Sequence, residues 1–191
     1  MYVLSPGIGV RQVNRLFKRF RTFGLSMGQP ALVGNNVNHP TTRRDRRYRF
    51  RYVTFVEMMC PVFTRESLYE LLDTFEMTRS GWGVDCVWAR RFMDRRVGIL
   101  DEVPVRHLKP RSSDGPYYQK LLAENVDAEE EMNEVLREHV TPGRTWSRPM
   151  QLVEYLAQEG VTNVHEAERG KLKPSAALLS KLGFGTRERG A

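Results

Sequence analysis

The sequence predicts an α/β protein in which helices flank a mixed sheet and a helical extension follows. Strand-like runs alternate with amphipathic helical segments up to about residue 112, and only helical segments follow. With 191 residues, 40% of them hydrophobic, the chain can bury a core in one domain and still carry an appended piece. We therefore expect a core domain over residues 1–112 and a helical extension over residues 113–191.

Apolar runs are too short for a membrane span. No window approaches the roughly 18 consecutive apolar residues that a span needs, and charges interrupt the first twenty residues, so a signal peptide is not expected either. Cys60 and Cys86 lie in apolar surroundings, which favours reduced, packed thiols over a disulfide framework or a metal cage. These features predict a cytoplasmic protein.

The positive charge is unevenly distributed. The net charge is +7, and the sequence pI is near 9.7. Cations crowd the first quarter, where Asp45 is the only acid, whereas residues 124–138 are strongly acidic. Apart from the run 43–51, these cations are Arg11, Arg15, Lys18, Arg19 and Arg21. Such an excess attracts phosphates, nucleic acid or anionic lipid headgroups.

The first elements follow from apolar spacing. Apolar residues at helical spacing predict a helix from Val10 to Phe23 that ends at Gly24, and Met27 to Val33 could supply a short strand before a loop over residues 34–42. The alternation from Tyr48 to Tyr52 predicts a strand with aromatic and arginine faces; the arginine face is either simply solvated or binds anions. Its two faces are Tyr48, Phe50 and Tyr52, and Arg47, Arg49 and Arg51.

The middle of the chain predicts a central strand followed by two helices. The strand is the apolar run Val53–Phe63, interrupted only by Glu57. Thr64 is a suitable N-cap for a helix with one apolar stripe. The stripe consists of Leu68, Leu71, Leu72 and Phe75. Gly81 and Gly83 then allow a tight turn before a helix over residues 84–93, whose buried side is Val87, Trp88 and Phe92.

The last third is predicted to be mainly helical. Residues 96–108 contain two short strand pieces broken at Asp101-Glu102, and a polar linker follows. Helices are expected over residues 117–124, 128–139, 149–158 and 174–183, with Asp127 and Glu130 at the spacing of a capping box in the second of them.

Several blocks of the first 110 residues resemble the bacterial and plant family known as domain of unknown function 707, which is treated as glycosyltransferase-like. In chain order the blocks are Asn14-Arg-Leu-Phe17, Gln29-Pro-Ala-Leu32, His39-Pro40, Phe55-Val-Glu-Met-Met-Cys-Pro-Val-Phe63, Ser80-Gly-Trp-Gly-Val-Asp85 and Val103-Pro-Val-Arg-His107. The Gly-Trp-Gly-x-Asp block also resembles the acceptor-side signature of several GT-A glycosyltransferases. The resemblance implies a partial GT-A-like sheet and transfer of a sugar from a nucleotide sugar to a hydroxyl acceptor.

The resemblance also implies roles for particular residues. Asp85 would be the general base that deprotonates the acceptor hydroxyl, and Glu57 would orient the acceptor or the helix that carries Asp85. Trp82 would stack on the apolar face of a sugar. His107 would contact the metal or the diphosphate, and the positive charges of Arg106 and Lys109 would neutralise the leaving diphosphate.

Each of these residues also has a purely structural interpretation. Asp85 could cap its own helix, Glu57 could pair with an arginine of the basic strand, and His107 could be an ordinary residue at a strand end. Trp82 could belong to the core. Arg106 and Lys109 could be solvated charges.

One part of the family pattern is missing at the front. The acidic Asp-x-Asp loop that would hold a divalent cation, Mn or Mg, should precede the first helix, yet residues 5–9 read Ser-Pro-Gly-Ile-Gly. We therefore expect a fragment or mis-started product of a longer gene, a degenerate relative that kept only the acceptor half, or a chain that binds a partner supplying the lost half. In each case the chain should be inactive alone, bind no cation by itself, and expose an edge strand and an apolar patch. The alternative is a basic module that binds nucleic acid or another polyanion through the strand Arg43–Arg51.

Overall fold

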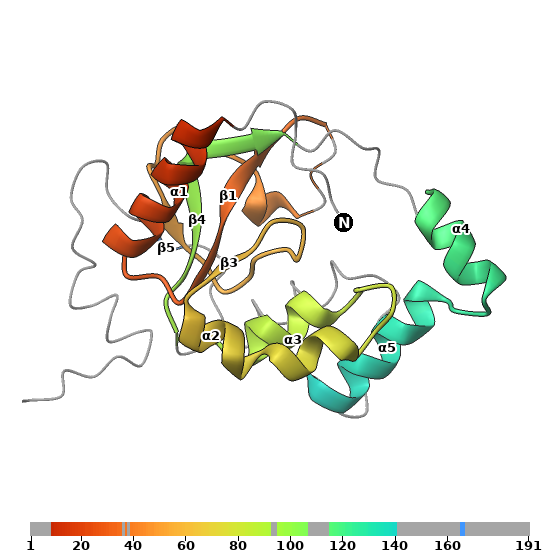
Figure 1. Cartoon of the computed structure of the whole chain (residues 1–191). Helices are drawn as coiled ribbons and strands as arrows, with labels where there is room; N and C mark the ends of the chain where they lie inside the picture. Colours follow the sequence, from red (N-terminus) through yellow and green to blue (C-terminus); the bar gives the residue numbers. More distant parts are fainter. Residues whose placement is uncertain are drawn as a thin grey trace, which may run out of the picture.

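The sheet is mixed, which confirms the predicted α/β class. The computed structural model describes residues 9–35, 37, 39–92, 95–106 and 115–140, together with the backbone of residues 165–166. The strands lie in the order β3-β1-β4-β2-β5 (Figure 1). Their bounds are β1 Met27–Val33, β2 Arg51–Tyr52, β3 Val62–Phe63, β4 Val97–Arg106 and β5 His165–Glu166. β1 and β4 are parallel, and the other pairs are antiparallel.

Helices cover both faces of this sheet (Figure 1). The α-helices are α1 Val10–Thr22, α2 Arg65–Glu70, α3 Val84–Arg91, α4 Pro116–Ala123 and α5 Ala128–His139, and the 3-10 helices are η1 Pro40–Thr42 and η2 Leu72–Glu76. Phe20 and Phe23 at the end of α1 pack on one face of the sheet, against Leu100 and β2. Trp88 of α3 packs on the other face, in a cluster that includes Ile99.

The described part of the helical extension is not separate from the core domain. Met132, Val135 and Leu136 of α5 are buried in one cluster with Cys86 and Val87 of α3. The layers therefore run α1, sheet, α3 and α5.

The predicted helix caps are confirmed. The Thr64 hydroxyl accepts a hydrogen bond from the Ser67 backbone N–H, and the Asp127 carboxylate accepts from the N–H groups of Glu129 and Glu130. Gly24, with φ at 61°, follows the end of α1. These ends depend only on residues a few positions apart.

The predicted central strand over Val53–Phe63 is wrong. Only Val62–Phe63 forms a strand, although residues 53–57 are buried. The Glu57 backbone N–H donates to the side chain of Gln29 at 2.6 Å instead of to a neighbouring strand. A polar side chain in β1 thus replaces the ladder partner that a strand would need.

The arginine–aromatic alternation forms a strand only at Arg51–Tyr52. Residues 45–48 form a turn in which the Tyr48 N–H donates to the Asp45 carbonyl. The prediction that Arg51 lies on a solvated face is wrong, because Arg51 is 4% exposed and pairs with Asp101. The predicted break at Asp101-Glu102 is also wrong, since β4 runs through both residues and only its register with β1 shifts.

The helix after Thr64 is shorter than predicted, and only one residue of its apolar stripe is buried. α2 ends at Glu70 and continues as the 3-10 helix η2. Leu71 is fully buried, whereas Leu68, Leu72 and Phe75 are 39%, 49% and 48% exposed. Periodicity identified the apolar row, but of its four residues only Leu71 packs in the core cluster that contains Trp88 and Ile99.

Some predictions fall on residues that the structure does not describe. His107, Lys109, the domain boundary at residue 112 and the helices expected over residues 149–158 and 174–183 lie outside the described residues. Within the described part of the chain, none of the helices has the length and apolar character to cross a membrane.

Candidate functional site

Two consecutive acids of β4, Asp101 and Glu102, bind the two basic segments of the chain from opposite faces of the sheet. Successive side chains of a strand alternate between its faces. Glu102 lies on the α1 face, where its carboxylate contacts Arg15 at 2.8 Å and Arg19 at 2.5 Å. The Glu102 side chain is only 8% exposed. Two arginines of α1 are therefore fixed on the middle of the sheet.

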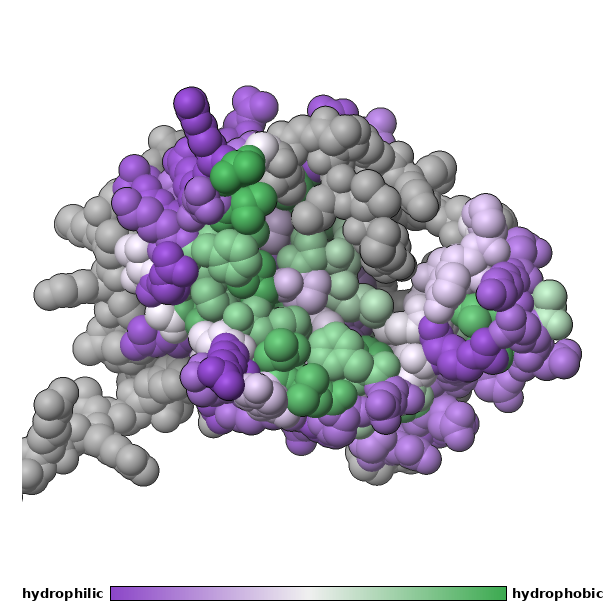
Figure 2. Space-filling view, in the orientation of Figure 1, coloured by the Kyte–Doolittle hydropathy of each residue, from purple (hydrophilic) through white to green (hydrophobic). Residues whose placement is uncertain are grey.

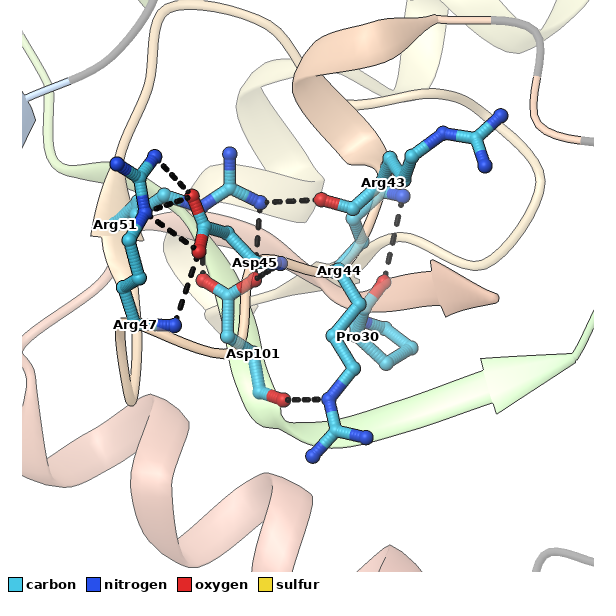
Figure 3. A network of polar contacts seen from close by, with 8 residues as sticks. Pro30, Arg43, Arg44, Asp45, Arg47, Arg51 and Asp101 are labelled. Carbon is cyan, nitrogen blue, oxygen red and sulfur yellow. Dashed lines mark hydrogen bonds and ion pairs between the residues drawn. The ribbon is translucent and has the colours of Figure 1, made fainter. Parts of the chain in front are cut away.

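Asp101 fixes the second basic segment from the other face (Figure 3). Arg51 donates to it twice, from Nε to Oδ2 at 2.8 Å and from Nη2 to Oδ1 at 3.0 Å. The backbone N–H of Asp45 donates to Oδ1 at 2.8 Å, and Arg44 Nε donates to the Asp101 carbonyl at 3.2 Å. Burial raises the pKa of Asp101, and the hydrogen bonds from Arg51 oppose that shift.

The two basic segments meet beside Glu102. Its backbone N–H donates to the carbonyl oxygen of Arg49 at 2.9 Å, so the turn after Asp45 runs next to the arginines of α1. We call the exposed cations of α1 and of this turn together the basic face, since Glu102 contacts Arg15 and Arg19 through its carboxylate and Arg49 through its backbone N–H. Its residues are Arg11, Arg15, Lys18 and Arg19 of α1 and Arg46, Arg47 and Arg49 of the turn. All of them are exposed except Arg19, which is half-buried.

Aromatic side chains attach the turn to α1. The Phe50 ring stacks on that of Phe23 with a centroid distance of 3.7 Å, and the Tyr52 hydroxyl donates to the Phe23 carbonyl at 3.3 Å. Phe50 and Tyr52 are buried, whereas Tyr48 is half-buried with the Arg47 guanidinium 5.3 Å from its ring centroid. The alternating aromatics thus hold the arginines in place, and Phe50 and Tyr52 are not available to stack on bases.

The acids near the basic face are held by arginines. Asp45 accepts hydrogen bonds from Arg47, which lower the pKa of Asp45 to about 2, so its charge is retained but locally balanced. Figure 2 shows the hydrophilic colour gathered over α1. The exposed cations of this surface exceed its acids, which gives a local positive potential.

The Gly-Trp-Gly turn (residues 81–83) lies on the opposite side of the protein, between α3 and α5. Gly81 and Gly83 have φ values of 83° and 86°, as a tight turn requires. Glu131 of α5 holds the turn, because its carboxylate accepts from the N–H groups of Arg79 at 2.9 Å and Ser80 at 2.8 Å. Sequence reasoning missed Glu131, since nothing local links it to a turn 50 residues away.

Asp85 lies in the first turn of α3 with its carboxylate against the loop before β3. Its Oδ2 accepts a long hydrogen bond of 3.4 Å from the Met58 N–H. Burial raises the pKa of Asp85 to about 6, and hydrogen bonds from Met58 and Cys86 oppose the shift. A carboxyl group that titrates near pH 6 can exchange a proton close to neutral pH.

Trp82 contacts α4. Its Nε1 donates to the Tyr118 hydroxyl at 2.8 Å, and the two rings meet edge to face with centroids 5.7 Å apart. The half-buried Trp82 also packs against the cluster between α3 and α5. These contacts support the core interpretation, and stacking on a sugar stays a prediction.

Glu57 is buried among hydrogen-bond donors. It accepts from the His39 N–H at 3.1 Å and from the Thr42 hydroxyl at 2.9 Å, both at η1. Burial lowers the pKa of His39 to about 4, and the His39 Nδ1 atom is buried without a hydrogen-bond partner. These contacts connect Glu57 to η1, and any contact with an acceptor stays a prediction.

Glu57 and Asp85 are brought close to each other, because Asp85 contacts the backbone of Met58, the next residue after Glu57. Arg106 is exposed at the end of β4 and paired in register with Val33 of β1. Among the described residues, no three His, Cys, Asp or Glu side chains form a group that could hold a metal ion.

Comparisons with family models, with curated proteins and with solved structures found no match to this chain.

Proposed function

We propose that the protein binds a polyanion, with nucleic acid as the expected form, through the basic face. The observation that supports this proposal is the joining of two basic segments, some 30 residues apart in the sequence, beside Glu102. If these arginines were only solvated, the buried acids Asp101 and Glu102 would not be needed to hold the two segments in place. Phosphate groups are the ligands that such a surface attracts.

The arrangement favours contact with the phosphate backbone over recognition of bases. Phe50 and Tyr52 are buried, so the base-stacking platform typical of single-strand binders is not present among these aromatics. Exposed arginines on a helix and a turn provide charge-assisted hydrogen bonds to phosphate oxygens. We therefore expect binding that depends weakly on sequence and steeply on salt.

The test is a titration of the whole chain with a fluorescent duplex of arbitrary sequence at several salt concentrations. Lys18→Gln and Arg49→Gln each remove one charge from the basic face, and Arg137→Gln removes one from the exposed side of α5. Each of the first two should weaken binding and lower the slope of log K against log salt by about 0.9. Equal effects of all three variants would contradict the proposal, as would the absence of binding at low salt.

A second candidate function is the glycosyltransferase-like one, in which Asp85 acts as a general base on an acceptor hydroxyl. The pKa of Asp85 near 6 and its place beside the Gly-Trp-Gly turn favour it. The remaining requirement is a donor site, and the Asp-x-Asp loop that the resemblance places before the first helix has no counterpart in residues 5–9. Calorimetric titration with a nucleoside diphosphate and manganese should then show negligible binding by this chain and binding after an upstream extension is added; no gain from the extension would refute this candidate.

A further inference from the structure

The helix α1 packs on the sheet through a narrow strip of its surface. Of its 13 residues only Phe20 is buried. Arg11 and Lys18 lie nine and two positions before Phe20, and at about 100° per residue both project roughly opposite that ring. Most of the helix surface is therefore open to a ligand, and hydrophilic side chains project from it in Figure 2.

The outer side of α1 carries cations over a wide arc and contains no acid. Arg15 and Arg21 bound this arc, about 120° apart around the helix, and Arg11 and Lys18 lie between them. Among the described residues, the ion pairs of α1 are those of Arg15 and Arg19 with Glu102, which leaves the other cations for a ligand. The exposed polar residues of the arc are Arg11, Asn14, Arg15, Lys18, Arg21 and Thr22.

A groove matches this arc better than a flat array of phosphates does. A plane touches only the crest of a helix, whereas a groove also contacts both flanks. The major groove of B-form DNA is about 12 Å wide and accepts an α-helix, whose diameter with side chains is about 10–12 Å. The minor groove, about 6 Å wide, is too narrow, and the major groove of an A-form RNA duplex is narrow and deep. The shape of α1 therefore distinguishes between nucleic acids that its charge alone would not.

We propose that the polyanion is a B-form DNA duplex and that α1 lies in its major groove. This inference rests on the proposed function and names the ligand of the same surface. Arg11 and Lys18 then face the floor of the groove, while Arg15 and Arg21 face the phosphates of the two strands that border it. The exposed Arg49 lies on the Arg15 side, because Glu102 contacts both residues, and adds a phosphate contact there.

Asn14 is an uncharged, exposed member of the arc. Its amide can donate and accept hydrogen bonds, and in the major groove an asparagine pairs with the edge of adenine. A single amide gives only a weak dependence on sequence, which agrees with binding dominated by phosphates. Because replacement of Asn14 by an uncharged residue changes no charge, this position separates insertion into a groove from simple attraction of charge.

The test compares nucleic acids of one sequence. The whole chain is titrated at moderate salt with a short fluorescent DNA duplex, the RNA duplex of the same sequence and the DNA single strand. The DNA duplex should bind at least about tenfold more tightly than either of the others. A DNA duplex whose major groove is filled by glucosylated hydroxymethylcytosine should bind at least about tenfold more weakly than the unmodified duplex.

A neutral substitution gives a second readout. Asn14→Leu should weaken binding of the DNA duplex at least about fivefold, with an unchanged salt slope and unchanged binding of the RNA duplex. Gln119→Leu, at an exposed amide of α4, is the matched control and should change none of these. Circular dichroism confirms that each variant is folded.

The outcomes separate this inference from the proposed function. If the chain binds the DNA and RNA duplexes equally or prefers the single strand, α1 does not lie in a major groove, although the basic face still binds polyanions. Wild-type affinity of Asn14→Leu for the DNA duplex overturns the inference in the same way. Absence of binding to all three nucleic acids at low salt contradicts both proposals.

Discussion

Replacement of Asp85 by Asn should stabilise the fold increasingly as the pH rises from about 4 to about 6, and by a constant amount above that range. Burial raises the pKa of Asp85 from 3.8 to about 6, so ionisation of this carboxyl group is harder in the folded chain than in the unfolded chain. A shift of about two pKa units corresponds to about 3 kcal/mol of lost stability once the group is ionised. Asn keeps an oxygen that can accept from the Met58 N–H but carries no charge.

The sign follows from proton linkage. A raised carboxyl pKa contributes stability below pH 3.8 that is lost as the pH rises through about 6. We therefore expect Asp85→Asn to raise the free energy of unfolding by about 2–3 kcal/mol at pH 8 and by almost nothing at pH 4. Urea denaturation at a series of pH values, followed by circular dichroism, measures this difference. A variant that is equally stabilised at both pH values, or destabilised at pH 8, would refute the buried position assigned to this carboxylate.

His39 makes the pH series more informative. Burial lowers the pKa of His39 from 6.5 to about 4, so this group contributes stability above pH 6.5 that is lost as the pH falls through about 4. The contributions of His39 and Asp85 therefore have opposite slopes between pH 4 and pH 6 and nearly cancel in the wild type. In Asp85→Asn only the His39 slope remains, and stability should fall steadily on acidification; adding His39→Gln should flatten that profile.

Three further substitutions test other parts of the structure by urea denaturation. Asp101→Ala should cost about 3–5 kcal/mol because it leaves the buried Arg51 charge unpaired, whereas the double variant Asp101→Leu with Arg51→Met should cost less; equal costs would contradict the pairing. Phe50→Ala should cost about 3–5 kcal/mol and also weaken polyanion binding, while Tyr48→Ala, at a half-buried ring, should cost far less. Gly83→Ala should cost about 1–2 kcal/mol, because φ is 86° and the added methyl group would meet Met132 at 3.4 Å; an unchanged stability would mean that the turn relaxes freely.

Local interactions account for what the sequence predicted well. The helix α1, the strand β1 and the cap at Thr64 depend on residue spacing and on neighbours within one turn. The turn of Gly81 and Gly83 could be predicted in the same way, because glycine adopts a positive φ without the steric cost that a side chain brings.

Interactions between distant residues account for what was missed. Residues 53–61 look like a strand by composition, but Gln29 satisfies the Glu57 N–H, and no pattern within the segment shows this. Arg51 looks solvated beside Arg49 until Asp101, fifty positions later, is placed next to it. The one feature of the sequence that pointed to these contacts is the acid pair of β4, since two acids inside an apolar strand require positively charged or hydrogen-bonding partners.

The candidate sites also combine features that local sequence predicts with features that only the fold creates. Asp85 could be identified from its turn, but its raised pKa depends on the loop of Met58, which only the fold places there. The positive charge of the two segments could be recognised in the sequence. That Glu102 brings the two segments together could not, because this contact depends on the fold.

The salt dependence of duplex binding by Glu102→Gln tests the central claim most directly. This variant removes the carboxylate that aligns Arg15 and Arg19 beside Arg49 and raises the net charge by one. If alignment of the two segments creates the binding surface, the variant should bind the duplex more weakly than the wild type at moderate salt and show a shallower slope, despite its greater positive charge. Tighter binding with an unchanged or steeper slope would show that net charge alone attracts the duplex and would contradict the account.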